Sequence, residues 1–143
     1  GKMKGKIFSE IGIGDEASFT VKCDEKLHNA FSNLSGDKSP IHCNEKFSSK
    51  TKFGKRIGYA FLLTSFVSRL YGEYLPGGTS VCIKQDAEFV KPYFIGDELK
   101  VVGKVTRKIE STKFVEIKTE IYRNKNELIF RGNGIVQVIF KNE

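Results

Sequence analysis

The sequence predicts an α+β fold in which a curved antiparallel sheet wraps around one long buried central helix. The first observation is the segment 56–72, RIGYAFLLTSFVSRLYG, which has no charged residue between Arg56 and Arg69. A helix that is apolar around most of its circumference must be buried. The second observation is that the periodicity changes to strict alternation after this segment. Long alternating stretches joined by short turns are typical of antiparallel sheets with one solvated face.

The length and composition predict one domain over residues 1–143. Hydrophobic residues make up 39% and charged residues 29% of the 143 residues, which is an ordinary globular balance. Gly1 and Lys2 precede Met3, and we interpret them as a cloning remnant outside the fold. The start resembles no signal peptide, and the apolar segment is shorter than the about 20 residues of a membrane span. We therefore expect no association with a membrane.

The first elements are a strand and a helix. Residues 17–22, ASFTVK, alternate as a strand does, and Asp24 is a good helix N-cap. Gly36 is a residue type at which helices end. The apolar positions of this helix fall at helical spacing, at Leu27, Ala30, Phe31 and Leu34. Asp37 is therefore expected at the start of a loop that directly follows a helix.

The remaining strands follow the apolar helix. They are expected at 81–89, 98–109, 113–122 and 128–140, with a turn at 123–127. In the first of them, Val81, Ile83, Ala87 and Phe89 share one face, and Lys84, Asp86 and Glu88 share the other. A curved sheet around a single helix is the hotdog fold. Because the sheet covers only one side of the helix, we expect a homodimer that buries the apolar remainder.

The loop SGDKSPIH, residues 35–42, carries the candidate chemistry. Asp37 and His42 are five residues apart, which does not suit one helix face. Pro40 fixes its own φ and favours an extended Ser39, so both side chains can turn inward together. A carboxylate and an imidazole that face one cavity can exchange protons with a single water. The alternative is that Asp37 caps a turn and His42 is a satisfied core residue, and the loop alone favours neither.

The segment LSGDKSPIHCN closely resembles the hydratase motif of MaoC-like dehydratases and (R)-specific enoyl-CoA hydratases. Further matches follow in register: FG at 53–54, Ile57, Ser65, Ser68, LPG at 75–77, Gln85, Phe89, Pro92 and GDEL at 96–99. The resemblance covers nearly the whole chain. It implies a hotdog homodimer, a hydro-lyase that reversibly adds water across the double bond of a trans-2-enoyl thioester. The substrate would be an acyl-CoA or acyl-carrier-protein thioester, with no cofactor and no metal.

The same resemblance implies roles for individual residues. Asp37 would act as the base that polarises water at the β-carbon, and His42 would exchange the proton at the α-carbon. Ser68 matches a serine that supports the aspartate. The backbone N–H of Ala60 would bind the thioester oxygen at the start of the central helix, where developing negative charge is favoured.

Two departures from the family pattern bear on the substrate. The usual asparagine before the proline is Ser39 here, at a position that supports the loop. The common HGM at the helix start is replaced by Tyr59, Ala60 and Phe61. We expect Tyr59 and Phe61 to reshape the acyl pocket.

The charge and the cysteines give weaker indications. The net charge of +7 suggests an acidic partner. Basic residues alternate with apolar and acidic ones, as in KVTRKIESTKFVEIK, so we expect no nucleic-acid partner, whereas a phosphorylated small molecule would fit. Cys23, Cys43 and Cys82 form no disulfide pattern or zinc motif, which favours a reducing cytoplasm. We interpret Cys43 as a buried small hydrophobe and His28 as a helix-surface residue.

Two other functions remain open. A hotdog thioesterase would direct water at the carbonyl carbon, and release of free thiol would identify it. A non-catalytic hotdog protein would only bind acyl chains or a partner. The presence of both Asp37 and His42 argues against the latter, while the altered helix start keeps it open.

Overall fold

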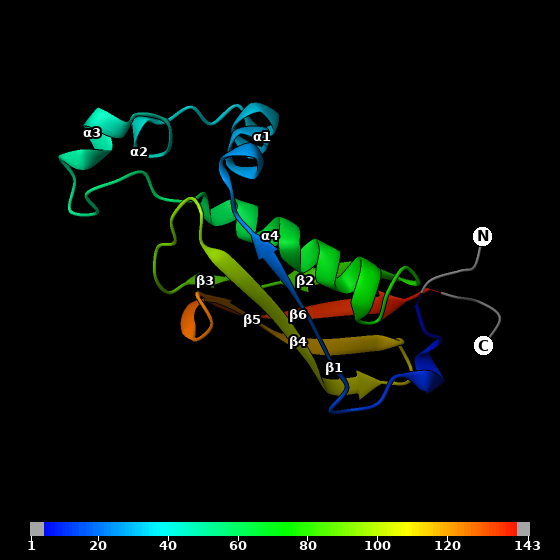
Figure 1. Ribbon diagram of the computed structural model, residues 1–143. Coiled ribbons are helices and arrows are strands. Elements are labelled where there is room, and N and C mark those ends of the chain that lie inside the picture. Colours follow the sequence, from blue (N-terminus) through cyan, green and yellow to red (C-terminus); the bar gives the residue numbers. More distant parts are fainter. Residues whose placement is uncertain (1–4, 140–143) are drawn as a thin grey trace.

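The computed structural model describes residues 5–139, so Gly1, Lys2 and the expected strand end at Phe140 lie outside the described residues. The helices are η1 (Phe8–Glu10), α1 (Glu25–Ser35), α2 (Pro40–Cys43), α3 (Glu45–Ser49), α4 (Ala60–Arg69) and a π-helical turn, η2 (Leu70–Tyr74). The strands are β1 (Glu16–Lys22), β2 (Ser80–Gln85), β3 (Glu88–Phe89), β4 (Glu98–Ile109), β5 (Phe114–Arg123) and β6 (Glu127–Val138). In Figure 1 the sheet curves beneath α4, while α1, α2 and α3 lie beyond one end of it.

The sheet is antiparallel throughout, with the order β1-β4-β5-β6-β2 and with β3 paired to β6. Its inner face and α4 share one core, whose fully buried side chains include Leu70, Leu99, Val101, Val115, Ile117, Ile121, Ile129, Phe130 and Val136. Gly103 on β4 permits close approach, because a Cβ there would lie 2.8 Å from the Leu70 side chain. The predicted α+β architecture of a sheet wrapped around a central helix is confirmed.

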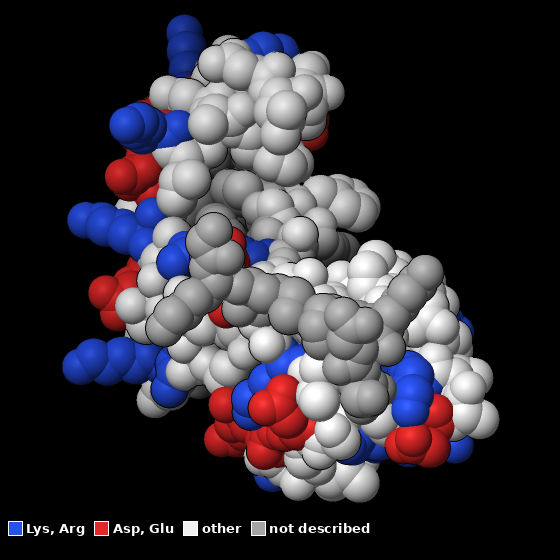
Figure 2. Space-filling view, turned by 90° about the vertical axis from the view of Figure 1, so that its right-hand side faces the viewer, with Lys and Arg blue, Asp and Glu red and all other residues white. Residues whose placement is uncertain are grey.

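The outer face of the sheet is charged and largely self-neutralising. Opposite charges stand directly across neighbouring strands at Glu16 and Lys104, Lys22 and Glu98, Arg107 and Glu116, and Glu120 and Arg131. Such cross-strand pairs stabilise a sheet modestly. Figure 2 shows basic side chains projecting from one margin of the molecule with acidic side chains among them.

The central helix is shorter than the sequence pattern predicts. It begins at Ala60 instead of Arg56, because the preceding residues pair with another segment. Ile57 forms a β-bridge with Phe94, and the Gly58 N–H donates to the Tyr93 carbonyl at 2.7 Å. In the described part of the chain, residues 5–139, no helix is long and apolar enough to cross a membrane.

The strand predicted at 81–89 is divided into β2 and β3. A register shift between Cys82 and Lys84 bends β2, and residues 86–87 separate it from β3. On this outermost strand of the sheet, Val81 and Ile83 are 44% and 50% exposed. The alternation therefore correctly indicates an apolar face on this strand, and no other part of the described chain buries that face.

The boundaries of α1 agree with the prediction, whereas its buried face does not. The Asp24 carboxylate accepts from the Leu27 N–H at 2.9 Å, and Gly36 ends the helix with φ 77°. The predicted apolar face was wrong in part, because Leu34 is 85% exposed. The buried residues of α1 are His28 and Ser32. They are four residues apart and so share one helix face.

Candidate active site

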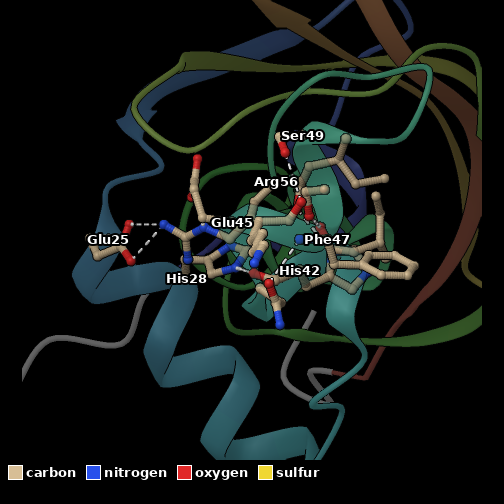
Figure 3. Close-up of polar contacts among 12 residues, drawn as sticks. Glu25, His28, His42, Glu45, Phe47, Ser49 and Arg56 are labelled. Carbon is tan, nitrogen blue, oxygen red and sulfur yellow. Dashed lines mark hydrogen bonds and ion pairs between the residues drawn. The ribbon is translucent and has the colours of Figure 1, made fainter.

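Residues 25–57 form a segment that projects beyond the N-terminal end of α4, and we call it the overhang (Figure 1). It contains α1, α2 and α3 and carries both Asp37 and His42. Arg56 joins two of its helices, donating to Glu25 of α1 at 2.9 Å and to Glu45 of α3 at 2.7 Å. Figure 3 shows these ion pairs next to the two histidines.

The loop between α1 and α2 is shaped by Pro40. Ser39 is extended, with φ −58° and ψ 143°, as expected for a residue before proline. Pro40 then occupies the first turn of α2, where its missing N–H costs nothing. The sequence pattern did not reveal this four-residue helix, because one turn has no periodicity to detect. The turn brings His42 back toward Ile57.

Asp37 presents its carboxylate to solvent in a hydrogen-bonded turn. Its Oδ1 accepts from the Ser39 N–H at 3.0 Å. This backbone hydrogen bond lowers the pKa of the Asp37 carboxyl below its ordinary value. The group is therefore an anion at neutral pH and can accept a proton or polarise water. Ser39, predicted as a supporting residue, is in direct contact with it.

His42 is half-buried, and its tautomer follows from its hydrogen bond. Its Nδ1 lies 2.8 Å from the main-chain oxygen of Ile57. Because a carbonyl oxygen can only accept, Nδ1 carries the proton in the neutral ring, and Nε2 is left with a lone pair. The ring is thus oriented to take or return a proton through Nε2.

His28 was predicted on the helix surface, and this was wrong. It is 1% exposed, and its Nε2 donates to the main-chain oxygen of His42 at 2.8 Å. Its Nδ1 is buried without a hydrogen-bond partner. Burial lowers the pKa of His28 below its ordinary value. The signal that could have revealed this role is its four-residue spacing from Ser32.

Cys43 was predicted to be buried, and this was wrong as well, because its side chain is exposed. In an extended chain Cys43 would point away from its neighbour His42, whereas Cys43 is the last residue of the helical turn α2. Its Sγ lies 3.5 Å from the hydroxyl of Tyr59.

Tyr59 is 2% exposed and stacks on the His42 ring, whereas Phe61 is 69% exposed at the start of α4.

Ala60 is the first residue of α4 and is half-buried. An N–H in the first turn of a helix has no partner within that helix, so the N–H of Ala60 is suited to a negatively charged oxygen. The structure places this N–H directly after Tyr59, close in sequence to the ring that stacks on His42. The role predicted for Ala60 stays a prediction.

Ser68 lies elsewhere within the single chain. It lines a groove of about 480 Å³ along α4, together with Phe61, Thr64, Val67, Tyr71, Gly72, Ser80, Cys82, Gln85 and Ala87. Eight residues of helix separate it from Ala60, a rise of about 12 Å. The structure therefore does not bring Ser68 next to Asp37 of the same chain. The predicted support of Asp37 by Ser68 therefore stays a prediction.

The described residues contain no group of three or more His, Cys, Asp or Glu side chains that could hold a metal ion. At the predicted site the overhang instead carries the carboxylate of Asp37, the imidazole of His42 and backbone amides. Such a set supports proton transfer and stabilisation of an oxyanion.

Comparison with known families gives an extensive match. The family described as "MaoC like domain" matches residues 9–126. The (R)-specific enoyl-CoA hydratase of Rhodospirillum rubrum is 33% identical over 131 residues, which cover 92% of this chain and 90% of that protein. The (R)-specific enoyl-CoA hydratase of Aeromonas caviae is 30% identical over 128 residues, covering 90% of this chain and 96% of that protein.

The same fold occurs among solved structures. The unliganded R-hydratase PhaJ1 of Pseudomonas aeruginosa superposes with a TM-score of 0.91 at 24% identity, covering 97% of this chain and 89% of that one. The likeness confirms the predicted hotdog fold.

Proposed function

The chain belongs to the MaoC-like domain family, and we propose that it is an (R)-specific enoyl-CoA hydratase, or 3-hydroxyacyl-thioester dehydratase. In this reaction a hydro-lyase adds water reversibly, with syn geometry, to the double bond of a trans-2-enoyl thioester. The relatives named as (R)-specific enoyl-CoA hydratases support this assignment. We place the protein in cytoplasmic fatty-acid metabolism, as one domain without a cofactor.

The observation that carries the proposal is that one short loop holds both an ionised Asp37 and a His42 whose Nε2 bears the lone pair. In dehydration, Nε2 accepts the proton from the α-carbon, while Asp37 hydrogen-bonds the hydroxyl group on the β-carbon. The protonated Nε2 then gives that proton to the departing hydroxyl, which leaves as water, so the pair gains and loses no net proton over a turnover. Hydration is the reverse, in which the oxygen bonds to the β-carbon and the proton returns to the α-carbon.

Negative charge develops on the thioester oxygen when the α-carbon loses its proton. We assign the N–H of Ala60 to this oxygen, because the first turn of α4 presents unpaired N–H groups and the positive end of the helix dipole. Phe61 stands beside this position, 69% exposed, and we assign it to the wall of the acyl pocket.

We further propose a homodimer. Apolar side chains remain exposed on the overhang, on α4 and on β2, at Phe47, Phe61, Val81 and Ile83. A second copy would cover these side chains, and isologous pairs are the commonest assembly. If Ser68 supports an aspartate, that aspartate belongs to the second copy, since Ser68 is about two helical turns from Ala60 of its own chain. A stable monomer at micromolar concentration in light scattering would contradict the dimer.

The test is a panel of trans-2-enoyl thioesters of increasing chain length on coenzyme A and on acyl carrier protein. Hydration is followed by the loss of absorbance of the conjugated double bond. We expect turnover of at least one member, and the better carrier identifies the physiological partner. Release of free thiol without loss of the double bond would identify a thioesterase instead. Binding without either change would identify a non-catalytic protein.

A further inference from the structure

A single buried side chain, Tyr59, touches both residues of the proposed catalytic pair. Its ring stacks on the His42 imidazole, with centroids 4.0 Å apart and an interplanar angle of 25°. Its hydroxyl donates to the main-chain oxygen of Asp37 at 2.6 Å. Tyr59 is 2% exposed, so its own ring and hydroxyl are shielded from solvent.

Tyr59 is itself held from two sides. The rings of His28 and Phe31 on α1 pack against it, each with centroids 4.8 Å away. Its main-chain oxygen accepts from the buried hydroxyl of Tyr93 at 2.7 Å. The fit beside it is tight, because a Cβ at Gly58 would lie 2.2 Å from the Tyr93 ring. The position of Tyr59 is therefore determined by both the overhang and the body of the fold.

The hydroxyl of Tyr59 has a single hydrogen, and it uses this hydrogen to donate a hydrogen bond to the main-chain oxygen of Asp37. Toward the thiol of Cys43, whose Sγ lies 3.5 Å away, the tyrosine oxygen can then act only as an acceptor. Burial raises the pKa of Tyr59 to about 12. Tyr59 thus remains a donor throughout the neutral range and takes no part in proton exchange with the substrate.

We propose that Tyr59 is a positioning residue that sets the placement of the Asp37 carboxylate relative to the His42 imidazole. This inference rests on the proposed function. The hydroxyl holds the main chain from which the carboxylate projects, and the ring supports the face of the imidazole. Water addition requires both groups on one face of the substrate, and a misplacement of about 1 Å can cost about 10²-fold in rate.

Two substitutions separate the two contacts. Tyr59→Phe removes the hydroxyl and keeps the ring, and we expect kcat to fall roughly 10-fold with KM changed less than about 2-fold. Tyr59→Leu removes the stacking as well, and we expect a fall of about 10²-fold. The matched control is Thr79→Val. The Thr79 hydroxyl is also buried and also donates to a main-chain oxygen, that of Lys6 at 2.7 Å, but it lies outside the overhang.

Amide hydrogen exchange of residues 36–43 provides a readout independent of turnover. We expect faster exchange in Tyr59→Phe than in wild type and unchanged exchange in Thr79→Val, while both variants lose similar stability. If the wild type hydrates no enoyl thioester, the proposed function fails and the exchange data still decide whether Tyr59 holds the loop. Wild-type exchange in Tyr59→Phe, or wild-type kcat in an active enzyme, would overturn the proposal.

Discussion

The overhang and the body of sheet and α4 are held together by different kinds of interaction. In the body, apolar side chains of the sheet and the central helix are fully buried, among them Leu63, Val101, Ile117 and Phe130. In the overhang, the buried side chains are polar, namely His28, Ser32 and Ser48. Of its large apolar side chains, Leu27 and Phe31 are partly buried against the core, whereas Leu34 and Phe47 are 85% and 48% exposed.

The overhang is organised by directional contacts to main-chain oxygens. The Ser48 hydroxyl lies 3.2 Å from the Pro40 oxygen and 3.1 Å from the Ile41 oxygen, and His28 donates to the oxygen of His42. Hydrophobic burial is non-directional, whereas a hydrogen bond fixes an angle and a distance. The comparison indicates that the body supplies most of the stability and the overhang supplies the geometry of the site.

The contrast between the overhang and the body predicts its largest effect at Asp37 and His42, where a substitution should lower turnover without unfolding the protein. We expect Asp37→Asn and His42→Ala each to lower turnover by at least about 10²-fold while the folded state persists, and the double variant to be little worse than the worse single one. Steady-state kinetics and thermal unfolding check this. Asp15→Asn is a matched control, since Asp15 is another carboxylate whose pKa a backbone N–H, that of Gly12, lowers. Near-normal hydration by either single variant would refute the assignment.

A truncation in each region should separate stability from geometry. Ile117→Ala in the body removes a fully buried side chain and should lower the free energy of unfolding by about 2–5 kcal/mol. Leu34→Ala in the overhang should change it by less than about 0.5 kcal/mol, because Leu34 is 85% exposed. Urea denaturation measures both. A large loss at Leu34 would show that a second copy covers it.

The buried His28 should make the overhang sensitive to acid. Burial is the main cause that lowers the pKa of His28 in the folded state; Arg56 adds to it, and Glu25 opposes it. The unfolded state therefore binds a proton more readily, so the free energy of unfolding is highest above about pH 6.5 and falls as the pH drops below it. His28→Gln should reduce this dependence. Thermal unfolding between pH 7.5 and pH 5.0, roughly spanning the ordinary histidine pKa, measures it. Equal slopes in both proteins would contradict the prediction.

The smallest expected effect concerns surface ion pairs in the two regions. Arg56→Met breaks the pairs with Glu25 and Glu45, and Arg131→Met breaks the pair with Glu88 on the sheet. Each should cost no more than about 1 kcal/mol and less at high salt, because the carboxylates are exposed. Only Arg56→Met should also lower turnover, since only Arg56 joins helices of the overhang. Kinetics and thermal unfolding at low and high salt distinguish the two.

The body of the fold was predictable because its signals are local and periodic. The boundaries of β4 agree with the predicted 98–109, and the predicted turn at 123–127 contains Asn124 and Lys125, with φ 47° and 85°. The start of α4 was not predictable, because Ile57 and Gly58 follow the apolar pattern of a helix yet pair with residues 93–94. A long-range pairing leaves no trace in the periodicity of the segment itself.

For the site, the sequence by itself determined which groups are present and in what order. Asp24 caps the helix through its carboxylate, and Gly36 and Pro40 act through their own backbone preferences, so these local effects place Asp37 at the start of a stiff loop. Only the tertiary structure decided how Asp37 and His42 are held. The tautomer of His42 depends on an oxygen fifteen residues away, and the contacts of Tyr59 reach Asp37 across twenty-two residues. Such contacts form only when the overhang packs against the body, because hydrogen bonds and ring stacking depend on distances that no local sequence preference sets.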